Sequence, residues 1–116
     1  MKRIYLICPV RGRAEDVGRQ LDAYVDTLEA DGALVYYPGR DSSIAKSHDE
    51  ARELVAGQRD EIASADEVHV WWEPQSFGSH FDLGMAFAMG KPTVLVNKFA
   101  LPEYPTYFDM IGVDDA

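Results

Sequence analysis

A short, almost continuous apolar run near the N-terminus is the feature that most restricts the fold. Residues 3–8 read R-I-Y-L-I-C, and the run ends at Pro9. Apolar residues at successive positions over this length are typical of a strand that is buried on both faces. Such strands belong to parallel sheets, in which helices connect one strand to the next. The run therefore predicts an α/β chain in which further strands alternate with helices.

The rest of the chain supplies that alternation. Runs rich in β-branched and aromatic residues predict further strands at 33–37, 67–72 and 93–97. Apolar stripes at helical spacing predict helices at about 14–30, 48–65 and 81–89. A short helix is expected near 107–111, and the last residues are expected to be loose. This order predicts one domain over residues 1–116, a three-layer α/β/α fold of flavodoxin or Rossmann type with a parallel four- to five-stranded sheet.

Composition excludes several classes of partner. A net charge of −9 argues against a nucleic-acid backbone or an anionic membrane surface as partner, although a small phosphorylated ligand needs only one local cationic site. The single cysteine excludes an internal disulfide and fits a reducing compartment. We see no signal peptide and no transmembrane run, so a cytoplasmic protein is expected. No cofactor is expected, and the three histidines lack the spacing of metal ligands.

The stretch from Ser64 to Pro92 carries the most chemical information. It reads as a strand, a turn-rich loop and a helix, with Ser79 predicted as the N-cap. Asp82 would then occupy the third helical position, as in a capping box, at the carboxyl end of a strand. Ligands of open α/β sheets bind at that edge. On the residues alone, Asp82 is either a site carboxylate or an acid that complements the helix dipole.

The loop after the first strand is a candidate phosphate site. It reads C-P-V-R-G-R-A-E-D over residues 8–16 and leads into a predicted helix. Arginine offers forked donors to phosphate oxygens, and a helix N-terminus supplies amides; the alternative is a pair of solvated surface arginines. Neither a Walker lysine nor a Rossmann glycine triplet is present. A cysteine phosphatase would need an arginine at Ala14, so Cys8 is interpreted as a buried strand end.

Two of these segments resemble the nucleoside 2-deoxyribosyltransferase-like superfamily, which includes nucleoside deoxyribosyltransferases and 2′-deoxynucleoside 5′-monophosphate N-glycosidases. Its members carry an alanine-aspartate pair before a strand, then a loop, then Gly-x-x-x-Glu-[Leu/Ile]-Gly-x-Ala. This chain has Ala65-Asp66 before the predicted strand and G-S-H-F-D-L-G-M-A at 78–86. The resemblance places the family's nucleophilic glutamate at Asp82, which is one methylene shorter.

The first loop is similar to that of the monophosphate N-glycosidases, which reads Gly-Ser-Ile-Arg-Gly-Gly-Arg-Glu-Asp. Arg11 and Gly12 match in register. The matching arginine of those enzymes grips the 5′-phosphate, so the resemblance implies the same role for Arg11. The preceding Gly-Ser pair is Cys8-Pro9 here, which removes one phosphate-binding hydroxyl.

The loop before the third helix adds a second phosphate signal. Ser76 falls where the monophosphate N-glycosidases have a phosphate-binding serine and the transferases an aspartate. The resemblance therefore favours a nucleotide over a nucleoside, with Gly78 and Ser79 beside the phosphate. His80 lies two residues from Asp82, where it would donate to a phosphate or a leaving base, or serve only as a capping or solvated residue.

Two further positions bear on catalysis by resemblance. Tyr5 matches the first-strand tyrosine that orients the nucleophile in the transferases, although a strand tyrosine is otherwise a routine core residue. The family's other acid falls on Gln58. This departure matters because a carboxyl group can protonate a departing base and an amide cannot.

The resemblance implies a double displacement in which Asp82 attacks the anomeric carbon and water or another base resolves the glycosyl-enzyme. The leading hypothesis is an N-glycosidase- or deoxyribosyltransferase-like enzyme that acts on the N-glycosidic bond of a nucleoside or deoxynucleoside 5′-monophosphate. An inactive nucleotide-binding or sensing module is the alternative, and a structural or interaction domain without a small ligand is the third. The resemblance also implies a homo-oligomer, a dimer or larger, because family members complete their sites across subunits.

Overall fold

Five parallel strands form one sheet in the order β2-β1-β3-β4-β5. The structure is a computed structural model, and it describes residues 1–97, 107 and 114–115. The strands are β1 (Arg3–Ile7), β2 (Leu34–Tyr36), β3 (Glu67–Val70), β4 (Thr93–Leu95) and β5 (Asp114–Asp115). The predicted α/β class and the parallel sheet are confirmed. The strand order reverses beside β1, because the chain passes from β1 outward to β2 and then back across to β3.

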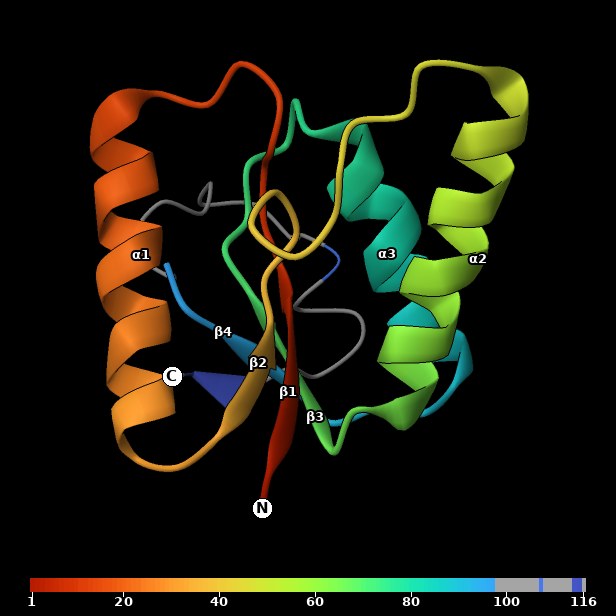
Figure 1. The fold of residues 1–116 in the computed structure, drawn as a ribbon. Coiled ribbons are helices and arrows are strands. Elements are labelled where there is room, and N and C mark those ends of the chain that lie inside the picture. The colour runs from red at the N-terminus through yellow and green to blue at the C-terminus, as the bar shows by residue number, and fades with distance from the viewer. Residues whose placement is uncertain (98–106, 108–113, 116) are drawn as a thin grey trace.

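Three helices cover the two faces of the sheet. They are α1 (Glu15–Ala30), α2 (His48–Ser64) and α3 (Phe77–Ala88). Figure 1 shows α1 alone on one face, with α2 and α3 side by side on the other. Alternate residues of β1 therefore enter two separate cores: Ile4 and Leu6 pack with Leu21 and Val25 of α1, whereas Tyr5 and Ile7 belong to the core that faces α2 and α3. The three-layer arrangement follows from a first strand that is apolar at every position after Arg3.

Hydrogen bonds from backbone amides to two side chains cap the start of α2. The Ser47 hydroxyl accepts a hydrogen bond from the backbone N–H of Glu50 at 3.1 Å. The Glu50 carboxylate in turn accepts one from the backbone N–H of Lys46, one residue before the cap. These bonds satisfy amides that have no partner within the helix.

The start of α3 was predicted too late. The helix begins at Phe77 with Ser76 at the N-cap position, so Ser79 is not the N-cap and Asp82 lies in the second turn instead of the first. The Ser79 hydroxyl is 2.8 Å from the Ser76 hydroxyl, and neither side chain caps a backbone N–H of the helix. Asp82 therefore has no capping role, which removes the helix-dipole interpretation of this carboxylate.

The C-terminal prediction was also wrong in part. Asp114–Asp115 form β5, which pairs in parallel with β4, whereas the sequence predicted a loose end. Backbone pairing at a sheet edge needs no apolar side chain, so the sequence pattern did not reveal it. The predicted short helix near 107–111 lies outside the described residues apart from Tyr107. Within the part of the chain that is described, no helix is both long and apolar enough to cross a membrane.

Candidate active site

A cavity of about 610 Å³ opens at the carboxyl ends of β1, β2 and β3. The residues after β1 supply one wall, the segment 38–44 after β2 supplies a second, and Leu54 and Gln58 of α2 close one side. The fourth wall is residues 75–79, at the start of α3, together with Asp82. The cavity thus lies beside the point where the strand order reverses, which is where doubly wound sheets bind ligands.

Asp82 and Tyr5 meet at the bottom of this site. The Tyr5 hydroxyl donates a hydrogen bond to Asp82 Oδ2 at 3.1 Å, across 77 positions of sequence. Tyr5 is fully buried, and Asp82 is 8% exposed and lines the cavity. The Tyr5 ring also stacks on that of Tyr36, with centroids 5.3 Å apart and an interplanar angle of 14°. The tyrosine is therefore fixed from two sides, and it holds one carboxylate oxygen in place.

Burial sets the protonation of this pair. Burial raises the pKa of Asp82 from 3.8 to about 6, and the hydrogen bond from Tyr5 acts in the opposite direction. Burial also raises the pKa of Tyr5 far above its ordinary value, and the neighbouring Asp82 charge raises it further. The phenol consequently stays protonated and acts as donor, while Asp82 is mostly ionised at neutral pH. A desolvated carboxylate of this kind is a suitable nucleophile.

The same cavity carries groups suited to an anion. Arg11 lines it from the β1 loop, and Ser76 and Ser79 line it from α3. Arg11 is exposed, whereas Ser79 is 2% exposed and hydrogen-bonded to Ser76. No side chain of the described residues caps α3, and an uncapped helix N-terminus favours negative charge. A carboxylate and groups chemically suited to an anion therefore share one cavity.

A protein-family model matches most of this chain. The family model described as nucleoside 2-deoxyribosyltransferase matches residues 4–106. The chain belongs to this family. It is a family of enzymes, and the predicted resemblance is confirmed. A search of curated proteins found no match.

Solved structures of similar fold include two enzymes of this kind. A 2-deoxyribosyltransferase from Bacillus psychrosaccharolyticus is 18% identical with a TM-score of 0.77, over 96% of this chain and 82% of that one. A CMP N-glycosidase from Clostridium botulinum is 19% identical with a TM-score of 0.68, over 99% of this chain and 86% of that one. At these identities the likeness is one of fold.

Two of the predicted site residues, Gly12 and His80, do not line the cavity. Gly12 adopts a φ of +66° in the turn after β1, a conformation that favours glycine, so it shapes the loop that carries Arg11. His80 Nε2 is 2.7 Å from the Pro74 carbonyl oxygen, and the His80 ring packs against Trp72 and Tyr107. The remaining predicted site residues are brought together around the cavity: Tyr5 beneath it, and Arg11, Gln58, Ser76, Gly78, Ser79 and Asp82 in its lining.

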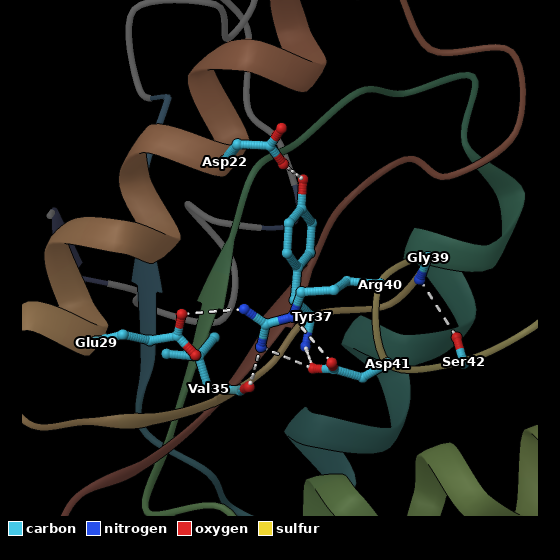
Figure 2. A network of polar contacts seen from close by, with 8 residues as sticks. All are labelled: Asp22, Glu29, Val35, Tyr37, Gly39, Arg40, Asp41 and Ser42. Atoms are coloured by element: carbon cyan, nitrogen blue, oxygen red, sulfur yellow. Dashed lines mark hydrogen bonds and ion pairs between the residues drawn. The ribbon is translucent and has the colours of Figure 1, made fainter.

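The segment 38–44 is the part of the site that sequence reasoning missed. Figure 2 shows how Arg40 fixes it: the guanidinium donates to the Val35 carbonyl oxygen and pairs with both Glu29 and Asp41. The Asp41 carboxylate also accepts from the Tyr37 backbone N–H at 2.8 Å. This places Ser42 and its neighbours in the cavity wall. The available signal was a polar segment directly after a predicted parallel strand, at the edge where ligands bind.

Other candidate groups have structural roles. Cys8 lines the cavity but is 7% exposed, and burial raises its pKa to about 12, so it is a thiol and not a nucleophilic thiolate. Trp71 and Trp72 both belong to the cores. His69 is buried between the Tyr24 hydroxyl and the Glu67 carboxylate. Among the described residues, no three metal-ligating side chains come together.

Proposed function

We propose that the protein cleaves the N-glycosidic bond of a nucleoside 5′-monophosphate, with the Asp82 carboxylate as nucleophile. The observation that carries the proposal is the buried Asp82–Tyr5 pair in a cavity that Arg11 also lines. In the first step Asp82 attacks the anomeric carbon and the base departs with the bonding electrons. In the second step water, or a second base, displaces the carboxylate.

The three anion-binding groups support a phosphorylated substrate. Arg11 supplies forked donors, and Ser76 with Ser79 supplies hydroxyls at the uncapped N-terminus of α3. The fold likeness to a CMP N-glycosidase supports the same choice. We therefore propose that Arg11→Met raises KM for monophosphates and leaves KM for the matching nucleosides little changed. A KM that rises equally for both substrates would argue that Arg11 does not contact the phosphate.

The test of the proposed function is release of free base from a panel of ribonucleoside and deoxyribonucleoside 5′-monophosphates, resolved by chromatography. Adding a second base to the same reactions separates hydrolysis from transfer. Base released by the native protein and not by Asp82→Asn supports the proposal. If no nucleotide, whether its base is unmodified or cationic, is cleaved but one of them raises the melting temperature, the protein is a binding module and not an enzyme. If neither occurs, the site has been wrongly assigned.

We also propose that the protein acts in the cytoplasm as a homo-oligomer. Helix α3 leaves Phe77 85% exposed, Phe81 58% exposed and Phe87 61% exposed. Phe77 and Phe81 are four residues apart on one face of the helix, and Phe77 also lines the cavity. Large exposed apolar patches mark contact surfaces. Analytical ultracentrifugation of the native protein and of Phe81→Ser tests this: a native oligomer that the substitution dissociates is expected, and a native monomer contradicts it.

A further inference from the structure

The cavity has an unusual set of proton-transfer groups. Among its described lining residues, the titratable side chains are those of Cys8, Arg11 and Asp82. Glu73 follows β3 but does not line the cavity. On the α2 wall, the polar residue is the amide Gln58. Within one chain, the lining of this cavity among the described residues therefore contains one carboxyl group, where two are usual for glycoside cleavage.

None of these three groups is suited to protonate a departing base, and neither is the Tyr5 phenol that contacts Asp82, because burial raises its pKa far above the ordinary value. Asp82 must be ionised to attack, so it does not donate a proton in the same step. Arginine does not give up its proton in proteins. The Cys8 thiol is too weak an acid, because burial raises its pKa to about 12 and efficient acids have a pKa near the working pH. An ordinary purine or pyrimidine leaves poorly without protonation, so the groups present favour a base that needs none.

We propose that the substrates of this site are nucleotides whose base already carries a positive charge on its ring, as in pyridinium and N7-alkylated purine ribosides. This inference rests on the proposed function. Asp82 Oδ forms a bond to C1′ while the C1′–N bond breaks. The electron pair of the C1′–N bond goes to the ring nitrogen and neutralises its charge, so the base leaves uncharged and no proton is transferred. Water then attacks C1′, the electron pair of the ester C–O bond returns to Asp82, and the proton from water goes to solvent.

The rest of the cavity agrees with a cationic ring. The Asp82 carboxylate lies within it, and the chain carries a net charge of −9. The Phe77 ring lines the same cavity, and an aromatic face attracts a cation. The Gln58 side chain has an NH₂ donor and a carbonyl oxygen acceptor. These can pair with the carboxamide of a pyridinium base or with the hydrogen-bonding edge of a purine, and the amide does not titrate. Gln58 is thus the specificity-determining position of the site.

Matched substrates test the proposal. The panel holds nicotinamide mononucleotide, 7-methylguanosine 5′-monophosphate, GMP and CMP, each measured with native protein, with Asp82→Asn and without protein to subtract spontaneous cleavage. We expect kcat/KM for at least one cationic nucleotide to exceed that for GMP and CMP by about a hundredfold, since general acid catalysis contributes 10²- to 10⁴-fold. Comparing nicotinamide mononucleotide with 7-methylguanosine 5′-monophosphate shows whether the site recognises a pyridinium or a purine ring. If GMP or CMP is cleaved as fast as both cationic nucleotides, this inference is wrong and the proposed function stands. If no nucleotide is cleaved, neither in this panel nor in the panel of unmodified monophosphates, the proposed function is wrong as well.

Gln58 variants and the pH profile give a second readout. Gln58→Glu supplies the missing acid, so the ratio of GMP to 7-methylguanosine monophosphate cleavage is expected to rise about a hundredfold. Gln58→Met has similar size and no acid, and it should not raise that ratio. For the native protein, kcat/KM with nicotinamide mononucleotide, whose ring charge does not titrate, should stay level from pH 7 to pH 9. A fall in that range would reveal a working acid and would contradict the proposal.

Discussion

The buried carboxylate of Asp82 makes a quantitative prediction about stability. One unit of pKa difference between folded and unfolded protein is worth about 1.4 kcal/mol. The rise from 3.8 to about 6 therefore destabilises the folded state by about 3 kcal/mol at neutral pH. In Asp82→Asn the side chain is neutral and keeps an oxygen that can accept the hydrogen bond from Tyr5. We expect this variant to be more stable than the native protein by about 2 to 3 kcal/mol at pH 7.

The sign of the pH dependence follows from the direction of the shift. Because the pKa is higher in the folded state, the folded protein binds more protons between pH 3.8 and about 6, so this group's contribution to stability falls as pH rises through that window. The difference between variant and native protein should therefore close toward pH 4 and reach its full size above pH 7. For a domain of this size it corresponds to a melting temperature about 10 °C higher at pH 7.

Urea unfolding followed by circular dichroism at pH 4, 5, 6 and 7 measures this difference directly. Asp26→Asn, an exposed aspartate on α1, is the matched control and should show no comparable gain. If Asp82→Asn is no more stable than the native protein at pH 7, or if it is more stable by the same amount at all four pH values, the ionised Asp82 carboxylate does not destabilise the folded protein. The expected result also shows that the inactive variant is folded.

Three further substitutions test other parts of the structure. Tyr5→Phe removes the hydrogen bond that lowers the pKa of Asp82, so the acid limb of the pH–rate profile should move to higher pH; an unmoved limb would mean that the pair does not form during catalysis. Ser47→Ala removes the cap of α2 and should cost about 1 kcal/mol in urea unfolding, whereas a neutral result would contradict the capping geometry. Asn97→Ala removes two buried hydrogen bonds to the Trp72 backbone and should cost about 2 to 4 kcal/mol, measured by the same unfolding experiment; a loss below 1 kcal/mol would refute that role.

The elements that sequence predicted well are those whose pattern is set by burial alone. The run after Arg3 is apolar at every position because both faces of β1 are covered, and the structure confirms it. The start of α3 is different, since Ser76 and Ser79 are both chemically suitable caps and only the fold decides between them. The first residue of α3, Phe77, is 85% exposed and does not belong to the apolar face of the helix, so the apolar pattern did not mark the helix start.

The family motif, and not periodicity, pointed to the two residues that the structure brings into contact in the candidate site. The contact between Tyr5 and Asp82 joins residues 77 positions apart, and periodicity does not reveal such a pairing. The family pattern, by contrast, predicted both residues. Segment 38–44 has no motif, and its place in the cavity wall depends on the bonds of Arg40 to residues on β2 and α1. Those bonds are long-range in the chain, so they become visible only in three dimensions.

The anchoring of segment 38–44 has a consequence for ligand affinity. Ordering a loop on binding costs free energy that the ligand must supply, at about 0.5–1.5 kcal/mol for each side chain immobilised. Here Arg40, Asp41 and Tyr37 fix the segment through hydrogen bonds within the chain, as Figure 2 shows. The ordering cost is thus met during folding. A ligand that enters this cavity finds the wall in place, so more of its contact energy remains as binding affinity.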